Sequence, residues 1–369
     1  MRHRAALTAL SLTLPLALSG CASPDLGVGY YWQSVTGHLH LMNAARPVQD
    51  WLDDHHTPAG LKTRLLLAQR IRAFSVAELA LPDNASYHRY ADLQRRAAVY
   101  NVVAAPALSL KLHTWCFPVA GCVGYKGYFS EADAKSFASS LPDTLEVAVY
   151  PVPAYSTLGW MNWAGGDPLL NTFMGYPEGE LARLLFHELA HQVVYVKDDT
   201  MFNESFATAV ERLGGARWLS QEASDSARES YRVFDERRQQ FRTLTREVRG
   251  QLQVIYSNSR WDDEQKLLRK AEVIATFRSD YEALKTRWGG YAGYDAWVTR
   301  ANNASFGAQA AYDELVPAFM ALFEREGRDF NRFYDAVRAL AAQPKEARQA
   351  ALKQLDASIA TRSAQHTSH

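Results

Sequence analysis

The feature that most constrains the fold is the run His187-Glu188-Leu189-Ala190-His191, set in the apolar stretch ELARLLFHELAHQVVYV. The flanking residues favour a helix, and residues four positions apart on a helix share one face. The two imidazoles therefore project from the same side, about one turn apart. The surrounding leucines and valines require this helix to lie in a core, so the rest of the chain must fold around it.

Two histidines at this spacing can reach one zinc ion. Glu188 lies beside them, where a carboxylate can take a proton from a water molecule held by the metal. A catalytic zinc needs a third protein ligand and an open fourth position, and another divalent ion could replace zinc. The alternative is a pair of buried histidines whose ring nitrogens bond to backbone carbonyls.

The predicted third ligand is Glu204. A polar turn follows the histidine helix, and a returning helix from about residue 201 would bring Glu204 back toward His187 and His191. The pair Asn203-Glu204 is similar to the opening of the ligand helix in gluzincin metallopeptidases. Asn203 and Glu211 are candidates for supporting the ligands, and Glu211 becomes the ligand itself if the register differs, because it lies seven residues later on the same face.

The N-terminus has the pattern of a secretory signal peptide over residues 1–20, with two arginines before an apolar run. Small residues precede Cys21, which is similar to the lipobox of bacterial lipoproteins, where this cysteine is lipidated. The alternative is an ordinary signal peptide with an incidental cysteine. Because Ala22 follows and not an aspartate, the resemblance implies an envelope lipoprotein on the outer membrane, facing the periplasm. Residues 21–29 would then be the lipid anchor and tether.

Export would place the chain in an oxidising compartment. Cys116 and Cys122 flank a Pro/Gly turn in HTWCFPVAGCVGY, and we predict a disulfide between them. The alternative is a metal-binding pair, but only His113 accompanies it as a further ligand in this stretch.

Composition argues against several classes of protein. The 40 Lys and Arg residues balance 40 Asp and Glu residues, and no block of like charge is long enough to indicate a nucleic-acid partner. No internal run has the length of a membrane span, so we expect no transmembrane helix in the mature chain. A hydrophobic content of 47% excludes a disordered protein.

The periodicity predicts a helix-rich α+β fold. Residues 30–176 mix helices with short strands, including one or two strands over 145–163. Residues 177–345 are predicted to be helical, with a long helical hairpin over 221–288. Residues 346–369 are expected to form a polar C-terminal tail.

Several segments resemble a family of bacterial lipoproteins described as predicted aminopeptidases, among them YYWQSVTGHLHLM, YSTLGWMNW, FHELAHQVVYVKDDTMFNESFAT and NNASF with YDELVPAFMALF. The resemblance covers about residues 27–340. It implies one zincin-like peptidase domain over 30–345, with an HExxH active-site helix and an added C-terminal helical region. It also implies zinc-dependent hydrolysis of short peptides, with His187, His191 and Glu204 holding one zinc ion and Glu188 as the catalytic base.

Two departures bear on the aminopeptidase label. Gluzincins often orient the first histidine with an acidic residue four or five positions after the asparagine, and here those positions hold Ala207 and Thr208. Gluzincin aminopeptidases also bind the substrate amine with a glutamate, but Asp167 is the only acid between Tyr155 and Tyr176. The sequence therefore supports a peptidase better than an aminopeptidase, and an envelope endopeptidase is an alternative.

A donor for the developing oxyanion is also needed, and a tyrosine or asparagine from later in the chain can supply it. The candidates are Tyr291, Tyr294, Asn303 and Tyr312. A different class of function is a non-catalytic lipoprotein that keeps a structural zinc and binds a partner. A structural zinc is closed by four protein ligands, whereas only three are evident here.

Overall fold

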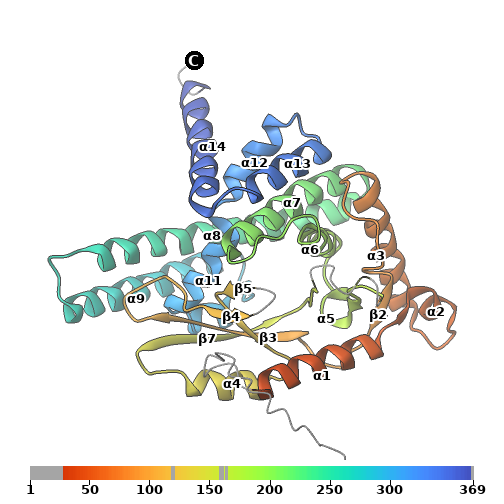
Figure 1. Cartoon of the computed structure of the whole chain (residues 1–369), viewed down its shortest axis with the longest axis horizontal. Coiled ribbons are helices and arrows are strands. Elements are labelled where there is room, and N and C mark those ends of the chain that lie inside the picture. The colour runs from red at the N-terminus through yellow and green to blue at the C-terminus, as the bar shows by residue number, and fades with distance from the viewer. Residues whose placement is uncertain (1–27, 118–120, 158–161, 163–164, 367–369) are drawn as a thin grey trace, which may run out of the picture.

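The computed structural model describes residues 28–117, 121–157, 162 and 165–366 (Figure 1). The predicted signal peptide and Cys21 lie outside these residues. The described helices are α1 Val28–Ala44, α2 Val48–Asp53, α3 Ala59–Ala77, α4 Glu131–Ser140, α5 Asn171–Met174, α6 Glu178–Ala190, α7 Thr200–Gln221, α8 Asp225–Ser257, α9 Asp263–Arg287, α10 Asp295–Thr299, α11 Asn303–Asp313, α12 Val316–Arg325, α13 Phe330–Ala341 and α14 Lys345–His366.

The described strands are short and form three small sheets. The first has the order β1-β2-β8, the second is antiparallel with the order β6-β3-β7, and the third is the hairpin β4-β5. Their bounds are β1 Arg46–Pro47, β2 Arg89–Ala91, β3 Val99–Pro106, β4 Trp115–Phe117, β5 Gly121–Val123, β6 Lys126–Tyr128, β7 Leu145–Val152 and β8 Leu169–Leu170. The protein is thus a helix-rich α+β fold, as predicted.

The N-termini of several helices are fixed by a polar side chain on the residue directly before the helix. Each accepts a hydrogen bond from a backbone N–H three residues later, a bond the helix itself cannot supply. Asp262 goes further and forms a capping box with Gln265. The other residues that cap in this way are Ser130, Asp199, Ser224, Asn302 and Asp329.

The sheet β6-β3-β7 is covered on both faces. Along β7, Val147 and Val149 face a cluster with Phe137 of α4. The alternate residues Ala148 and Tyr150 face a cluster with residues of α11. β7 pairs with β3 alone among the described strands, so its other edge is open to a further partner.

The main hydrophobic core surrounds α6 and α7 and includes residues of α3, α12 and α13. A second cluster lies between α8, α9 and α10 and is closed by Phe306. Figure 1 shows the α8–α9 hairpin reaching out from the body, with α6 and α7 near the centre. The histidine helix is therefore buried, while the hairpin predicted over 221–288 carries its own small core.

Two sequence expectations need correction at element boundaries. The helix that carries the histidines ends at Ala190, so residues 192–196 are not helical as the apolar pattern suggested. The strand predicted over 145–163 ends at Val152, and the described residues 153–157 belong to no strand. The rest of that segment, apart from residue 162, lies outside the described residues.

The C-terminal segment is also different from the polar tail expected over 346–369. Lys345–His366 forms α14, which packs against α12 and α13. Leu352 is fully buried, and Arg348 is buried in an ion pair with Asp199 at the start of α7. Only a few apolar residues dock this helix, so the sequence pattern resembles a solvated tail. Among the described residues, no helix has the length and apolar character needed to cross a membrane.

Candidate metal centre

α6 and α7 bring three side chains together in the core. His187 lies in the last turn of α6, His191 follows its final residue, and Glu204 lies in the second turn of α7. The Nε2 atoms of the two histidines are 3.2 Å apart. Glu204 Oε2 lies 3.3 Å from Nε2 of His187 and 3.5 Å from Nε2 of His191. All three residues are buried.

These distances fit a zinc ion. Donor atoms at about 2.0–2.1 Å from a tetrahedral zinc are separated from one another by about 3.3–3.4 Å. The three observed separations scatter around that value. Two imidazole nitrogens and one carboxylate are also a known donor set for catalytic zinc. The residues present therefore fit the ion, and a second group of suitable donors, at Asp54, His55 and His56, is largely exposed.

Glu211 orients His187. Its Oε2 lies 3.0 Å from Nδ1 of His187 and accepts a hydrogen bond from that ring nitrogen, which leaves the Nε2 lone pair directed at the centre. The other oxygen of Glu211 pairs with the buried Arg183. The sequence left open whether Glu211 supports a ligand or is one, and in the structure it contacts Nδ1 of His187 and lies outside the group of His187, His191 and Glu204. It replaces the acidic residue missing at Ala207 and Thr208.

The histidines and carboxylates of the centre shift one another's pKa values. Burial opposes a charged His187, yet the hydrogen bonds that Glu204 and Glu211 accept from its ring outweigh this effect and raise the pKa of His187 to about 10. Burial likewise opposes a charged Glu204, but His191 and His187 hold its pKa well below the usual range. The centre thus keeps the Glu204 carboxylate ionised, which is the form in which a carboxylate binds a divalent cation.

Glu188 differs from Glu204 although both lie at the centre. Its side chain is only half-buried. Burial raises the pKa of Glu188, and the nearby charges of Glu204 and Asp167 add to the shift while the two histidines oppose it. A carboxylate with a raised pKa is better able to accept a proton and return it near neutral pH.

The connection between α6 and α7 is held by side chains of its own. Asn203 accepts a hydrogen bond from the N–H of Val196 and donates one to its carbonyl, both at 2.8 Å. The suggestion that Asn203 supports a metal ligand directly is therefore corrected, since its amide fixes the connecting turn. Asp199 caps α7 and is held by Arg348 of α14.

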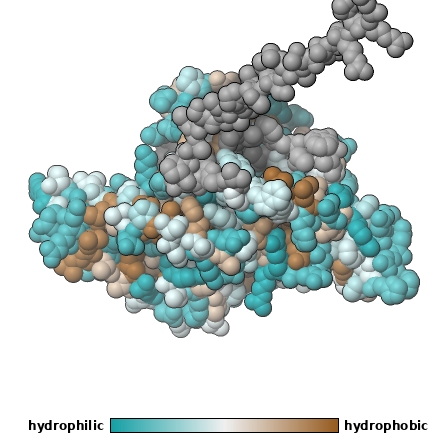
Figure 2. All heavy atoms as spheres, turned by 60° about the horizontal axis from the view of Figure 1, so that its bottom comes forward, coloured by the Kyte–Doolittle hydropathy of each residue, from teal (hydrophilic) through white to brown (hydrophobic). Residues whose placement is uncertain are grey.

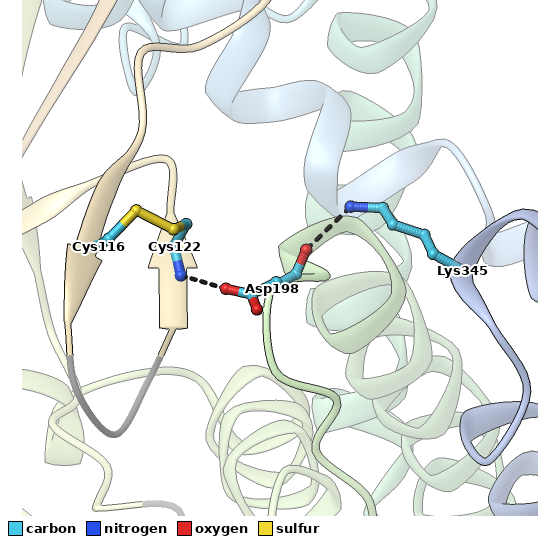
Figure 3. The surroundings of a disulfide bond; sticks show 4 residues. All are labelled: Cys116, Cys122, Asp198 and Lys345. Carbon is cyan, nitrogen blue, oxygen red and sulfur yellow. Dashed lines mark hydrogen bonds between the residues drawn. A yellow bond between two sulfur atoms is a disulfide. The ribbon is translucent and has the colours of Figure 1, made fainter.

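A disulfide joins Cys116 and Cys122 and lies against the same connection (Figure 3). The Asp198 carboxylate accepts a hydrogen bond from the N–H of Cys122, and its carbonyl accepts one from Lys345 at 2.9 Å. Gly121 has φ of +75°, and a Cβ there would collide with the Asp198 carboxylate. The disulfide hairpin thus braces the turn between His191 and Glu204.

Among the four oxyanion candidates, Tyr312 lies at the centre. Its ring stacks on His187 with 6.1 Å between the ring centroids. The backbone on both sides of Tyr312 is held by Ser205 of α7. The Ser205 hydroxyl donates a hydrogen bond to the carbonyl of Ala311 and accepts one from the N–H of Leu315.

The other three candidates lie elsewhere and are corrected. Tyr294 stacks on Phe241 in the second hydrophobic cluster, and Tyr291 packs against both Tyr294 and Arg237. Asn303 is buried between Tyr256 and the carbonyls of Pro106 and Ala107. The loops that contain these residues are polar or glycine-rich, as expected for an oxyanion donor. Tyr291 and Tyr294, however, pack with the α8–α9 hairpin in the second hydrophobic cluster.

Two further tyrosines at the centre were not singled out from the sequence. Burial raises the pKa of Tyr125 and Tyr150, and the Glu204 charge adds to both shifts. Burial and the charge of Glu204 also raise the pKa of Tyr312. These side chains come from the β5–β6 connection, β7 and α11. Tyr125, Tyr150 and Tyr312 are too far apart in the sequence for their spacing to indicate that they meet.

Asp167, the only acid between Tyr155 and Tyr176, is buried and already hydrogen-bonded. It accepts hydrogen bonds from the N–H and hydroxyl of Thr157, the hydroxyl of Ser156 and the amide of Gln192. Gln192 directly follows His191, so this network fixes the end of the histidine helix. Beside it, the buried hydroxyl of Tyr87 has no hydrogen-bond partner among the described residues.

A cavity of about 860 Å³ adjoins the centre. Residues Val147–Pro153 of the open β7 edge form one wall, α10 and α11 form another, and Tyr150 and Tyr312 line it. The Val147 carbonyl points away from β3, because it accepts a hydrogen bond from Asn302. In an antiparallel ladder the outward direction recurs every second residue, so the backbone of Val149 also faces the cavity.

The fold and the centre together define a helix-rich α+β protein with a buried group of two histidines and one glutamate. The model of a family described as putative aminopeptidases matches residues 29–352. The chain therefore belongs to this putative aminopeptidase family, and the name suggests hydrolysis of peptides. No curated protein and no solved structure matches the chain.

Proposed function

We propose that the protein is a zinc-dependent peptidase with a zincin-like centre. The observation that carries this proposal is the triangle of His187, His191 and Glu204 donor atoms, at zinc-ligand separations, with Glu188 beside it. Membership in the putative aminopeptidase family supports peptide hydrolysis as the reaction.

His187, His191 and Glu204 would hold the ion. A bound zinc supplies Lewis acidity toward a carbonyl oxygen and makes water easier to deprotonate. Glu188 takes a proton from the attacking water while the oxygen of that water bonds to the scissile carbonyl carbon. The same carboxyl then delivers that proton to the amine that leaves when the C–N bond breaks. Tyr312 is positioned to donate its hydroxyl hydrogen to the oxygen of that carbonyl.

The substrate would be an extended peptide in the cavity beside β7. The outward N–H and C=O groups of Val149 can pair with a peptide backbone, which gives affinity with little dependence on sequence. Tyr150 and Tyr312 line the cavity at the end nearest the metal ligands. Cleavage of short peptides from their amino end is favoured by the family name, and endopeptidase activity is the alternative.

We place this activity in the bacterial cell envelope, with the chain anchored to the outer membrane through Cys21. The signal pattern over residues 1–20 and the lipobox-like sequence support this location. The disulfide between Cys116 and Cys122 is consistent with an oxidising compartment.

The test is to measure metal content and peptide cleavage on the same purified protein. One zinc per chain and cleavage that a chelator abolishes and zinc restores are expected, and the cut positions distinguish exopeptidase from endopeptidase. Bound zinc without cleavage of a mixed peptide library would instead support a binding protein with a structural zinc. Absence of zinc binding would reject the proposal.

A further inference from the structure

Helix α1 presents an unusual combination of residues to solvent. Tyr31, Trp32, Val35 and Leu39 are 39%, 70%, 54% and 51% exposed, and they make up half of the exposed large hydrophobic residues described. We call these four residues the α1 stripe. Their spacings of three and four positions put them on one side of the helix.

The opposite side of α1 attaches it to the body. Leu41 is fully buried, and the ring of Tyr30 packs edge-on against Tyr128. Gly37 lies so close to the ring of Phe129 that a Cβ there would collide with it. These three inner residues lie about half a turn from the α1 stripe, so the stripe faces outward while the helix is held in place.

We propose that the α1 stripe docks on the surface of a lipid bilayer. Tyr and Trp are the residues that favour the interface between lipid and water, where an apolar ring meets a polar edge. The helix contains no Asp, Glu, Lys or Arg, so no charge has to leave water when the stripe enters the interface. Figure 2, which turns the lower side of Figure 1 toward the viewer, shows hydrophobic residues reaching the surface among hydrophilic ones.

The position of α1 in the chain favours a membrane as the partner. Six residues separate Val28, the first residue of α1, from Cys21, the predicted lipid attachment point. A chain of that length spans at most about 25 Å when fully extended, so a lipid on Cys21 would keep α1 close to the bilayer. A second copy of the chain fits less well, because a stable interface uses roughly 20–30 residues a side.

This inference does not depend on the peptidase activity. The lipid anchor adds only local concentration, so the contact can be measured on the purified full chain whether or not Cys21 carries lipid. The probe is a vesicle of phosphatidylethanolamine and phosphatidylglycerol whose acyl chains carry bromine, which quenches a tryptophan that enters the interface.

The Trp32 signal is the difference in fluorescence between the wild-type protein and Trp32→Phe. We expect brominated vesicles to reduce that difference by at least about half relative to unbrominated vesicles. The Trp261 signal is the difference between the wild-type protein and Trp261→Phe, which lies at the tip of the α8–α9 hairpin. It should be equal with brominated and unbrominated vesicles. Unquenched Trp32 emission would overturn the proposal.

A second pair of variants tests the rest of the stripe. The triple variant Tyr31→Ser, Val35→Ser and Leu39→Ser keeps Trp32 as reporter, and its quenching should fall at least about threefold. The matched control changes Val254, Leu267 and Leu268 to serine, three exposed residues of the α8–α9 hairpin, and should retain full quenching. Equal loss in both triples, or a dimer that the α1 triple alone dissociates without vesicles, would reject a specific membrane contact.

Discussion

At the residue scale, the centre depends on a chain of contacts that begins outside the ligand set. Arg183 pairs with Glu211, Glu211 accepts the hydrogen bond of His187 Nδ1, and His187 directs Nε2 toward His191 and Glu204. All of these side chains are largely buried, so each contact replaces water that the group has lost. Glu211 is therefore bonded on both sides, through one oxygen to Arg183 and through the other to His187.

Replacing Glu211 with alanine should weaken zinc binding and folding together. His187 loses its orienting acceptor, and we expect zinc affinity to fall about 10–100-fold. Arg183 loses its closest acidic partner in a buried setting, which should lower the free energy of unfolding by about 3 kcal/mol. Competition with a chromophoric chelator and denaturant unfolding measure the two effects. Glu211→Gln, which keeps an acceptor, should lose less zinc affinity, and equal affinities for alanine and wild type would contradict the role assigned to Glu211.

Tyr312→Phe tests whether the tyrosine stacked on His187 acts in the reaction. The phenylalanine keeps the ring contact and removes only the hydroxyl. If that hydroxyl stabilises the oxyanion, kcat should fall about 10²–10³-fold while KM and zinc content change little. Tyr291→Phe, in the second hydrophobic cluster, is the matched control and should leave kcat unchanged. Unchanged kcat for Tyr312→Phe would assign the ring a packing role.

At the scale of elements, the candidate metal centre is held by segments far apart in the sequence. The disulfide hairpin β4–β5 braces Asp198, and α14 braces both Asp198 and Asp199. These two aspartates lie between His191 and Glu204. The C-terminal helix therefore contributes to the geometry of the centre although it supplies no ligand.

Arg348→Ala should show that α14 is part of the folded domain. Arg348 and Asp199 are each less than 5% exposed, and removing one partner of a buried ion pair leaves the other unpaired. We expect the free energy of unfolding to fall by about 3–5 kcal/mol in denaturant titrations. Arg338→Ala breaks an exposed pair with Asp335 and should change it by less than about 0.5 kcal/mol. A small effect for Arg348→Ala would mean that α14 is only loosely attached.

The parts of the site that could be predicted from the sequence are those fixed within one or two helices. His187 and His191 share a helical face, and one turn and one returning helix suffice to add Glu204 and Glu211. Tyr125, Tyr150 and Asp199 with Arg348 could not be predicted, because only the packing of distant elements brings them to the centre. The same reason explains why a polar tail was expected where α14 lies. Leu352 and Arg348 are buried only because α14 packs against α12 and against the start of α7.

At the scale of the whole molecule, zinc should act as part of the core. Its three predicted ligands join α6 to α7, the two helices around which the main core is built. A ligand that binds only the folded state stabilises it by about 4 kcal/mol at 1,000 times its Kd. We therefore expect added zinc to raise Tm by several degrees and a chelator to reverse the change.

The control for that measurement is the other group of potential metal ligands. His55→Ala with His56→Ala removes the exposed donors near Asp54, and the zinc-dependent shift in Tm should persist. His187→Ala should abolish it. A shift that follows His55 and His56 would place the zinc away from the proposed centre.

The most direct test of the central claim is peptide hydrolysis by Glu188→Gln. Glutamine keeps the size and polarity of the side chain but cannot take a proton from water. We predict one zinc per chain, an unchanged Tm and a rate reduced at least about 100-fold relative to wild type. Glu229→Gln, in an exposed pair with Arg232, should retain the full rate. Hydrolysis at the wild-type rate by zinc-loaded Glu188→Gln would contradict the account.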